Sequence, residues 1–333
     1  PDEAAKSLRL GKSQKTGHYR ISILVTRHDK HTDPFFSELI EAIRSEINQH
    51  MCIFANIWFE QSFSDEDEAE KMNIKKVVND LYNDGKTDGL IIIGKCLPKV
   101  ISELKSKWKN IVSVNRNSTN NEVDEVICDG AKIASKAVNH LIRLGHRKIS
   151  YIGECRNESR FKGFQETMLM HNIEMNLDYI FQAKASENDG YSAMERIIKL
   201  SNRPTGIYCS SGIIAIGVLK ALSKFSNRYY NPSVISSDDI SEAKYTKPML
   251  TTLSLPKKEM AKYAVYLLVD KLNYGHKSVT KIEVESTLVI RNSCNPLNNS
   301  DYIEYCIWYF GFAFQNISSV YRNKNLQQLG SHG

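Results

Sequence analysis

The chain has 333 residues and carries 44 Lys and Arg against 38 Asp and Glu, a formal net charge of +6. A composition of 41% hydrophobic and 25% charged residues is typical of a globular protein with a sizeable core, so disordered and fibrous classes are excluded. The length suits one large domain or two lobes.

The sequence shows no membrane or secretion signal. No apolar run reaches the roughly 20 residues that a membrane-spanning helix needs, and the N-terminus lacks the apolar core of a signal peptide. The seven cysteines are widely spaced and form no CxxC pair. They favour reduced thiols in a cytosolic protein over a disulfide framework or a zinc site. We therefore expect a cytoplasmic protein with no metal, no cofactor and no membrane partner.

The first 20 residues carry half of the net charge, because five basic side chains stand there against two acidic ones. Pro1, Asp2 and Glu3 are a favourable helix start, with the acids at the positive end of the helix dipole. This helix is predicted to stop near Gly11.

Strand and helix patterns alternate from Ile21 onward. β-Branched runs predict buried parallel strands, and apolar residues at helical spacing predict the helices between them. The predicted strands are 21–26, 52–59, 89–93, 111–114, 148–152, 206–209, 233–236 and 281–290. The predicted helices are 36–48, 69–82, 98–108, 131–144 (ended by Gly145), 160–170, 190–200, 213–223 and 257–272. This order predicts an α/β fold of two doubly wound parallel-sheet lobes.

Ligands of such sheets bind beyond the carboxyl ends of the strands. The residues that directly follow predicted strands are therefore the candidate ligand-binding positions: Arg27, Lys95, Asn115, Asp129, Ser211 and Asp238. Residues 295–333 break the alternation with the aromatic run DYIEYCIWYFGFAF. This tail is either a docked segment, an interfacial segment or non-native read-through sequence.

No common enzyme motif is present, since GxGxxG, the P-loop, GxSxG and HExxH are all absent. His28 and His31 are read as part of a solvated loop rather than a metal site. The acidic run at 65–68 is read as a solvated helix start. Trp58 and Trp108 are read as packing residues in preference to sugar-stacking ones.

An ordered series of motifs resembles the LacI/GalR family of sugar-responsive bacterial repressors. HLIRLGHRKI at 140–149 matches that family's HLIxLGHRxI pattern almost letter for letter. The other motifs are PDEAAKSL at 1–8, DPFFSEL at 33–39, DGLII at 88–92, RFKGF at 160–164, PTGIYC at 204–209, PMLTTL at 248–253 and LVIRNS at 288–293.

The resemblance implies a two-lobed, periplasmic-binding-protein-like core that forms a homodimer. It implies a hinge helix and linker at 1–17, a first lobe at 18–153 and 254–280, a second lobe at 154–253 and 281–294, and a tail at 295–333. It also implies that a sugar in the cleft reorients the lobes and thereby orders or loosens the hinge helices, where Leu8 wedges the DNA minor groove beside Ala5.

The resemblance also implies the effector contacts. Arg160 would donate to paired ring hydroxyls and Asp238 would accept from two of them. Asp129 and Arg27 would line the cleft from the first lobe, Ser211 would add a weaker hydrogen bond, and Tyr191 a stacking face. The motif that contains Ser211 departs from the family pattern. The family's CxND is CSSG at 209–212 here, so the acid is missing.

The expected function is therefore a sugar-responsive repressor core, with galactose or a galactoside as the favoured effector. No helix-turn-helix headpiece precedes Pro1 in this sequence, so operator binding is expected only with that headpiece. Two alternatives stay open. One is a sugar-binding protein of the same fold without a DNA function, and the other is an enzyme on a doubly wound fold.

Overall fold

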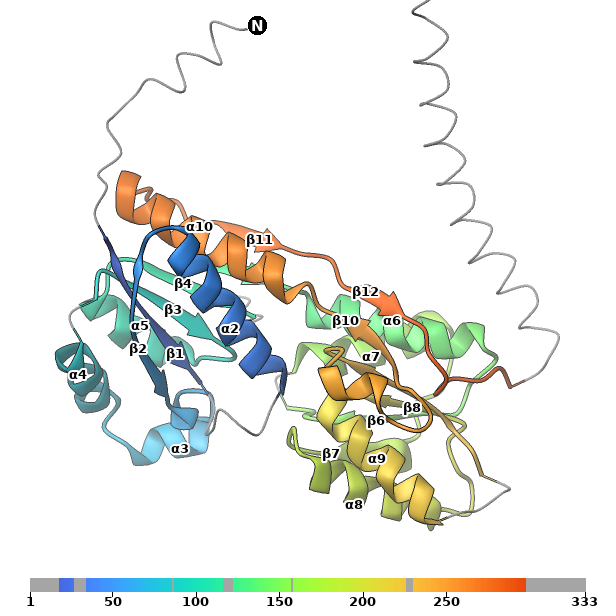
Figure 1. Ribbon diagram of the computed structural model, residues 1–333. Coiled ribbons are helices and arrows are strands. Elements are labelled where there is room, and N and C mark those ends of the chain that lie inside the picture. The colour runs from blue at the N-terminus through green and yellow to red at the C-terminus, as the bar shows by residue number, and fades with distance from the viewer. Residues whose placement is uncertain are drawn as a thin grey trace, which may run out of the picture. The chain divides into compact units, whose positions relative to one another are not determined.

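A computed structural model describes residues 18–26, 34–85, 87–115, 122–156, 158–225 and 230–297 (Figure 1). The chain divides into two compact units, one of Pro1–Asp129 with Leu255–Ser286 and one of Gly130–Ser254 with Thr287–Gly333. Each unit contains one six-stranded sheet with flanking helices, which confirms the predicted α/β fold class.

The sheet of the first unit is parallel throughout. Its strand order is β11-β5-β4-β3-β1-β2. The strands are β1 (Arg20–Val25), β2 (Ile53–Phe59), β3 (Gly89–Ile93), β4 (Ile111–Val114), β5 (Asp124–Ile127) and β11 (Lys281–Glu283). The helices of this unit are α2 (Pro34–Gln49), α3 (Glu66–Lys71), α4 (Ile74–Asp84), α5 (Pro98–Lys107) and α10 (Lys257–Tyr274), with a 3-10 turn at Gln61–Phe63.

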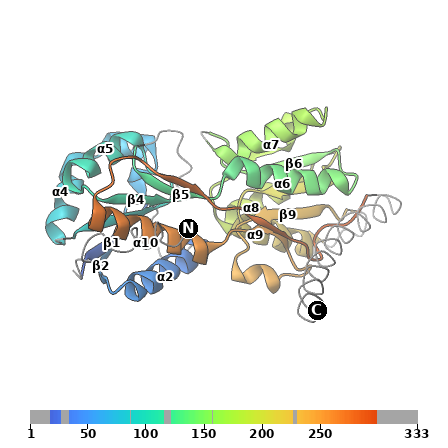
Figure 2. The same cartoon turned by 90° about the horizontal axis from the view of Figure 1, so that it is seen from above.

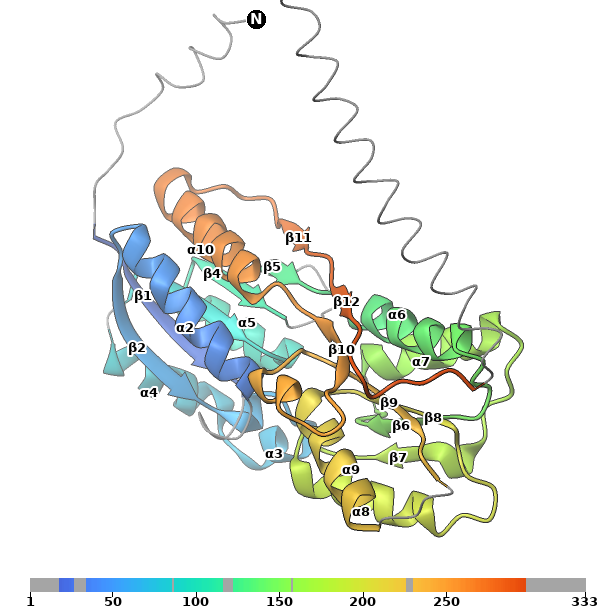
Figure 3. The same ribbon diagram turned by 45° about the vertical axis from the view of Figure 1, so that its right-hand side comes forward.

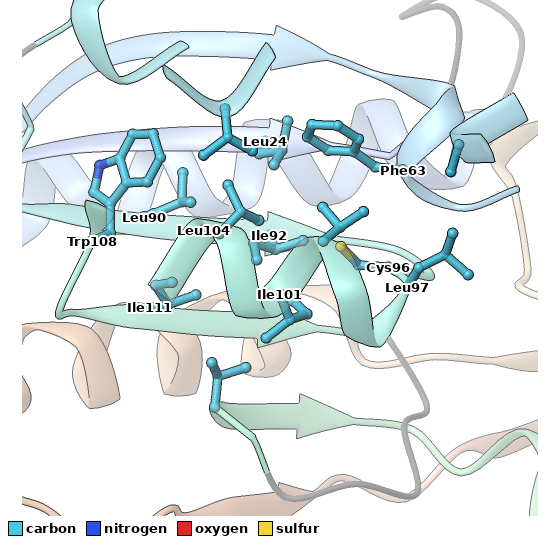
Figure 4. Packing of buried hydrophobic residues seen from close by; sticks show 14 residues of the cluster. Leu24, Phe63, Leu90, Ile92, Cys96, Leu97, Ile101, Leu104, Trp108 and Ile111 are labelled. Atoms are coloured by element: carbon cyan, nitrogen blue, oxygen red, sulfur yellow. The ribbon is translucent and has the colours of Figure 1, made fainter. Parts of the chain in front are cut away.

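Helices cover both faces of this sheet. α2 and α10 lie side by side, as Figure 3 shows. An apolar layer packs between the strands and α5, where Leu24, Leu90 and Ile92 meet Leu104 and Trp108 (Figure 4). Trp58 packs against the same cluster, so the packing interpretation of both tryptophans is confirmed.

The sheet of the second unit has the order β12-β10-β9-β8-β6-β7, parallel except for the β10–β12 pair. Its strands are β6 (Ile149–Gly153), β7 (Ile180–Gln182), β8 (Gly206–Cys209), β9 (Ser233–Ser237), β10 (Thr251–Ser254) and β12 (Thr287–Val289). Its helices are α6 (Gly130–Arg143), α7 (Ser159–Met170), α8 (Glu187–Ile198) and α9 (Gly212–Phe225), with 3-10 turns at Leu177–Tyr179 and Ser241–Lys244.

The predicted helix 69–82 is wrong, because the chain forms two helices there. Asp65 caps α3 by accepting from the backbone N–H groups of Asp67 and Glu68, which confirms the helix start in the acidic run. Asn73 then caps a second start by accepting from the N–H of Lys76. A side chain that satisfies the first N–H groups of a new helix separates α3 from α4.

The predicted strand 281–290 is also wrong, because it splits between the two sheets. β11 pairs with β5 in the first sheet, and β12 pairs with β10 in the second. The two segments of the first unit end at Asp129 and Ser286, and α6 and β6 belong to the second unit, whereas the resemblance implied ends at residues 153 and 280. Apolar spacing predicts a strand but does not specify the sheet that it joins.

The ranges of the chain that the structure describes contain six cysteines, all of them free thiols. Within these ranges no helix is long and apolar enough to cross a bilayer. The same ranges contain no group of three or more His, Cys, Asp or Glu side chains placed to hold a metal ion.

Candidate functional site

Asp238 directly follows β9 at the carboxyl edge of the second sheet. Its φ angle is +89° and that of Asp239 is +41°, a left-handed conformation that short polar residues tolerate better than others. Asp239 accepts from Arg291 Nη2 at 2.6 Å, and Arg291 Nη1 donates to the carbonyl of Leu250 at 2.7 Å. This pair fixes the turn that places Asp238, which is only 4% exposed.

Arg160 reaches the same place from the first turn of α7. Its Nη2 lies 3.4 Å from Asp238 Oδ1, and its Nη1 lies 3.6 Å from Glu158 Oε1. Glu158 also caps the helix by accepting from the backbone N–H of Arg160. Burial disfavours the charged guanidinium, but Asp238 and then Glu158 outweigh it and raise the pKa of Arg160 above its ordinary value. The guanidinium is therefore a fixed positive charge held between two carboxylates.

Aromatic side chains surround this group of charges. Tyr208, on β8, exchanges a 3.0 Å hydrogen bond with the hydroxyl of Ser237. Tyr151, on β6, donates to the carbonyl of Glu154 and packs 5.0 Å from the ring of Phe161. Burial raises the pKa of both tyrosines, so both phenols stay protonated and neutral. Charges surrounded in this way interact more strongly than they would in water.

Ser211 lies at the same sheet edge as Asp238. Cys209 of β8 pairs in register with Ser236 of β9. Ser211 comes two residues after Cys209 and Asp238 comes two residues after Ser236, so both lie just beyond the same edge. Ser211 is 6% exposed, and its hydroxyl has no hydrogen-bond partner among the residues that the structure describes.

The guanidinium of Arg160 leaves a second buried polar atom unpaired, because Nε also lacks a partner in the described structure. Proteins seldom leave buried donors unpaired, and each such group costs about 1–3 kcal/mol. A ligand with hydroxyl groups would satisfy both atoms, since a hydroxyl can accept from Nε and either donate to or accept from Ser211.

The missing family acid at position 212 has a local explanation. Gly212 opens α9, and a Cβ on this residue would lie 2.8 Å from Cγ1 of Ile240. Ile240 is buried two residues after Asp238. An aspartate at position 212 therefore fits only if Ile240 moves.

Tyr191 lies where α8 packs on α9. A Cβ at Gly217 would lie 2.7 Å from its backbone nitrogen, and the ammonium of Lys224 is 5.7 Å from the centroid of its ring. The contact with Tyr191 raises the pKa of Lys224. The stacking role of Tyr191 stays a prediction.

The remaining predicted positions belong to the first unit or lie outside the described residues. Asp129 directly follows Cys128 at the end of the first unit and is half-buried. Asn115 follows β4 with a φ of +56° and is buried. Arg27, Leu8, Ala5 and the histidine pair His28 and His31 lie outside the described residues.

Glu158 is the site residue that the sequence patterns missed. It is the residue two positions before the arginine of RFKGF, where an acidic residue caps α7. An acid at a predicted N-cap, beside a candidate ligand-binding arginine, is the signal that would have identified it.

Comparisons with known proteins agree with this architecture. Residues 138–294 match the family described as a periplasmic binding protein-like domain. The HTH-type transcriptional repressor PurR of Haemophilus influenzae is 26% identical over 311 residues, which cover 89% of this chain and 86% of the relative. These matches extend through both units of the chain.

Two solved structures share the fold. The transcriptional regulator CelR in complex with cellobiose superposes with a TM-score of 0.72 and 18% identity, over 88% of this chain and 89% of CelR. A LacI family transcriptional regulator from Enterococcus faecium with bound ribose superposes with a TM-score of 0.69 and 21% identity, over 84% of this chain and 100% of that one. Residues 138–294 thus resemble a periplasmic binding protein-like domain, and most of the chain is similar to a curated transcriptional repressor and to solved regulators that share its fold.

Proposed function

We propose that this protein is a sugar-responsive transcription repressor core whose effector binds at the carboxyl edge of the second sheet. The observation that carries the proposal is the pair of buried, unpaired polar atoms, Arg160 Nε and Ser211 Oγ, at the edge where Asp238 is held. An unsatisfied buried donor or acceptor at a strand-end edge is a feature that a bound ligand explains.

The chemistry of these groups suits neighbouring hydroxyls on a sugar ring. A guanidinium offers several N–H donors in one plane, so Arg160 would donate to adjacent ring oxygens. Asp238 would accept hydrogen bonds from the hydroxyl protons, and the Ser211 hydroxyl would add one more contact. CelR and the E. faecium regulator were solved with cellobiose and ribose, which supports a sugar over other effector classes.

The finer parts of the proposal follow the family resemblance. Asp129 and Arg27 would contribute to the effector site from the first unit, and galactose or a galactoside is the first effector to test. The protein would act in the cytoplasm as a homodimer that binds its effector without chemically changing it. Operator DNA would be contacted through Leu8 and Ala5 together with a helix-turn-helix headpiece.

A thermal-shift screen of mono- and disaccharides tests the proposal. We expect a sugar, with galactose and galactosides screened first, to raise the melting temperature of the wild type. Arg160→Met and Asp238→Asn should each weaken sugar binding about 10- to 100-fold, as loss of a charged hydrogen bond does.

Lys220→Met is the matched control, because Lys220 forms an exposed ion pair with Glu187 on the same unit. It should keep the full shift. The proposal fails if both site variants remain folded and still shift as the wild type does with the same sugar.

A further inference from the structure

The turn that carries Asp238 is held in an uncommon backbone conformation. Asp238 has a φ of +89° and Asp239 a φ of +41°, so two residues with side chains are left-handed in succession. Left-handed backbone is disfavoured for residues other than glycine, and such a turn keeps its shape only where surrounding contacts hold it. The contacts of this turn therefore decide where the Asp238 carboxylate lies.

Asp239 receives two of those contacts. Arg291 Nη2 donates to Asp239 Oδ1 at 2.6 Å, and the two side chains are only 10% and 13% exposed. Burial strengthens this ion pair, because little water competes for either charge. The backbone N–H of Asp239 donates to Thr252 Oγ1 at 3.3 Å, and the Thr252 hydroxyl in turn donates to the carbonyl of Ser236 at 3.1 Å. The turn is thus fixed by residues 13 and 52 positions further along the chain.

The two residues that hold Asp239 lie on connections between the two units. The chain leaves the second unit after Ser254 and returns to it at Thr287. Thr252 belongs to β10, which ends at Ser254, and Arg291 follows β12, which begins at Thr287 (Figure 2, orange to red). β10 and β12 pair with each other in the second sheet. The turn at the proposed effector site is therefore hydrogen-bonded to both of these connections.

The guanidinium of Arg291 is occupied by the protein itself. Nη2 donates to Asp239, and Nη1 donates to the carbonyl of Leu250 at 2.7 Å. A planar guanidinium that bonds two partners at once fixes their relative position. Arg291 is therefore placed to hold the turn, and an effector at Asp238 needs no direct contact with it.

We propose that Arg291 is a positioning residue for the effector: it holds Asp238 in place through Asp239 and thereby ties effector binding to the strands that connect the units. The inference rests on the proposed function, because it requires the effector to bind at Asp238. By linkage, an effector that stabilises this turn must also stabilise the strands that are bonded to it.

A double-mutant cycle on sugar affinity tests the positioning role. Galactose, or the screened sugar that gives the largest thermal shift, is titrated calorimetrically into the full-length chain. Arg291→Met and Asp239→Gly should each weaken binding about 10-fold, since each frees the turn. Glycine accepts a left-handed φ without strain, and the double variant removes both buried charges, so it should fold. The double variant should bind within about twofold of either single variant, whereas independent roles would multiply to about 100-fold.

Ser293→Ala is the matched control, because Ser293 lies two residues after Arg291 on the same segment and bonds to β9 and β10. Its buried hydroxyl donates to the carbonyl of Val234 at 2.6 Å and accepts from the N–H of Thr251 at 2.8 Å. The change should lower the stability of the protein but leave sugar affinity within about twofold. A loss of affinity equal to that of Arg291→Met would mean that any loosening of this segment weakens binding, and it would overturn the proposal.

Amide hydrogen exchange tests the link to the connecting strands. Saturating sugar should slow exchange several-fold in wild-type peptides that span β10 and β12. In the double variant, at its own saturating sugar concentration, the slowing should persist at α7, which carries Arg160, and be lost from β10 and β12. Equal slowing of β10 and β12 in both proteins would overturn the link.

Failure of the proposed function gives a different result. If Arg160→Met and Asp238→Asn leave the sugar affinity unchanged, the effector does not bind at this edge and the positioning role is wrong as well. If those two variants weaken binding while Arg291→Met does not, or if the double variant loses about 100-fold, only the positioning role is overturned.

Discussion

Arg160 Nη2 lies 3.4 Å from Asp238 Oδ1, although 78 residues separate the two in the chain. The contact joins the first turn of α7 to the left-handed turn after β9. Parallel strands bring their carboxyl ends to one edge, so a helix start and a strand end from distant parts of the chain meet there. The pair is the centre of the proposed effector site.

Replacing Ser211 should separate the stability of the free protein from effector binding. Ser211→Ala removes a buried hydroxyl that has no partner in the described part of the chain, so it should stabilise the free protein by about 1 kcal/mol. The same change should reduce the sugar-induced rise in melting temperature. Urea unfolding with and without sugar measures both effects.

Ser150→Ala provides the comparison, because Ser150 is also buried but donates to the carbonyl of Tyr179 at 2.6 Å. It should destabilise the free protein by about 1–2 kcal/mol. If Ser211→Ala destabilises the free protein as much as Ser150→Ala does, the Ser211 hydroxyl has a partner and its assignment to the site loses its basis.

A buried carboxylate should be important for the stability of the first unit. Asp124 is fully buried and accepts from Lys271 Nζ at 2.8 Å and the N–H of Thr280 at 2.8 Å, with His276 Nε2 at 2.9 Å. Asp124→Asn leaves Lys271 without its buried partner and should cost about 3 kcal/mol in unfolding free energy. Glu41→Gln, which breaks the exposed pair with Arg44, should cost under about 0.5 kcal/mol.

The Asp124 carboxylate should also make the stability of the first unit sensitive to acid. Burial raises the pKa of Asp124, but the hydrogen bond from Lys271 and the bonds from Thr280 and His276 outweigh it and lower that pKa below 3.8. The stabilisation is therefore present above the unfolded-state pKa and is lost as pH falls through the lower folded value. Asp124→Asn should flatten the unfolding free energy in this acidic range, and an unchanged profile would contradict the assignment.

His140 should make stability pH-dependent at milder acidity. Burial, with smaller contributions from Arg143 and His146, lowers the pKa of His140 to about 4 from the ordinary 6.5. The unfolded chain binds a proton between these values and the folded chain does not, so stability falls as pH drops from 6.5 to about 4. The loss should be on the order of 3 kcal/mol for this residue.

Urea titrations from pH 7 to about pH 4 check this prediction. His140→Gln should remove this part of the pH dependence. His171→Gln should keep it, because His171 is exposed. Equal pH slopes for the wild type and His140→Gln would show that His140 is protonated at its ordinary pKa.

Gly163 should be required for the close approach of α6 and α7. A Cβ at this position would overlap the backbone carbonyl oxygen of Ala131, which cannot move away as a side chain can. Gly163→Ala should therefore destabilise the second unit by about 3 kcal/mol. Gly275→Ala, where φ is +65° and no atom lies within 4 Å of the added carbon, should cost only about 1 kcal/mol. Similar losses for both variants would contradict the helix-contact argument.

The regular strands and helices were predictable because each has its own apolar pattern. The strands 89–93, 111–114 and 206–209 match β3, β4 and β8 at both ends. β7 was not predicted and spans only Ile180–Gln182. Three residues at the edge of a sheet are too few to show an alternation of apolar and polar side chains.

The site was predictable to the extent that it follows strand ends. Asp238 and Ser211 come from that rule, and Arg160 comes from the family motif. Glu158 was missed because its role depends on the guanidinium beside it and not on a motif of its own. Tyr191 was placed at the effector by resemblance, whereas packing of α8 on α9 sets its surroundings.

The sequence alone determined the alternation of strands and helices, the α/β class and the strand-end residues, because these depend on local apolar spacing and on residue type. Only the tertiary structure decided that β6 joins the second sheet, that 281–290 serves both sheets, and that Arg160 lies between Asp238 and Glu158. Those outcomes depend on contacts between residues far apart in the chain. Local patterns do not distinguish one possible strand or side-chain partner from another, whereas strand pairing and burial in the folded protein do.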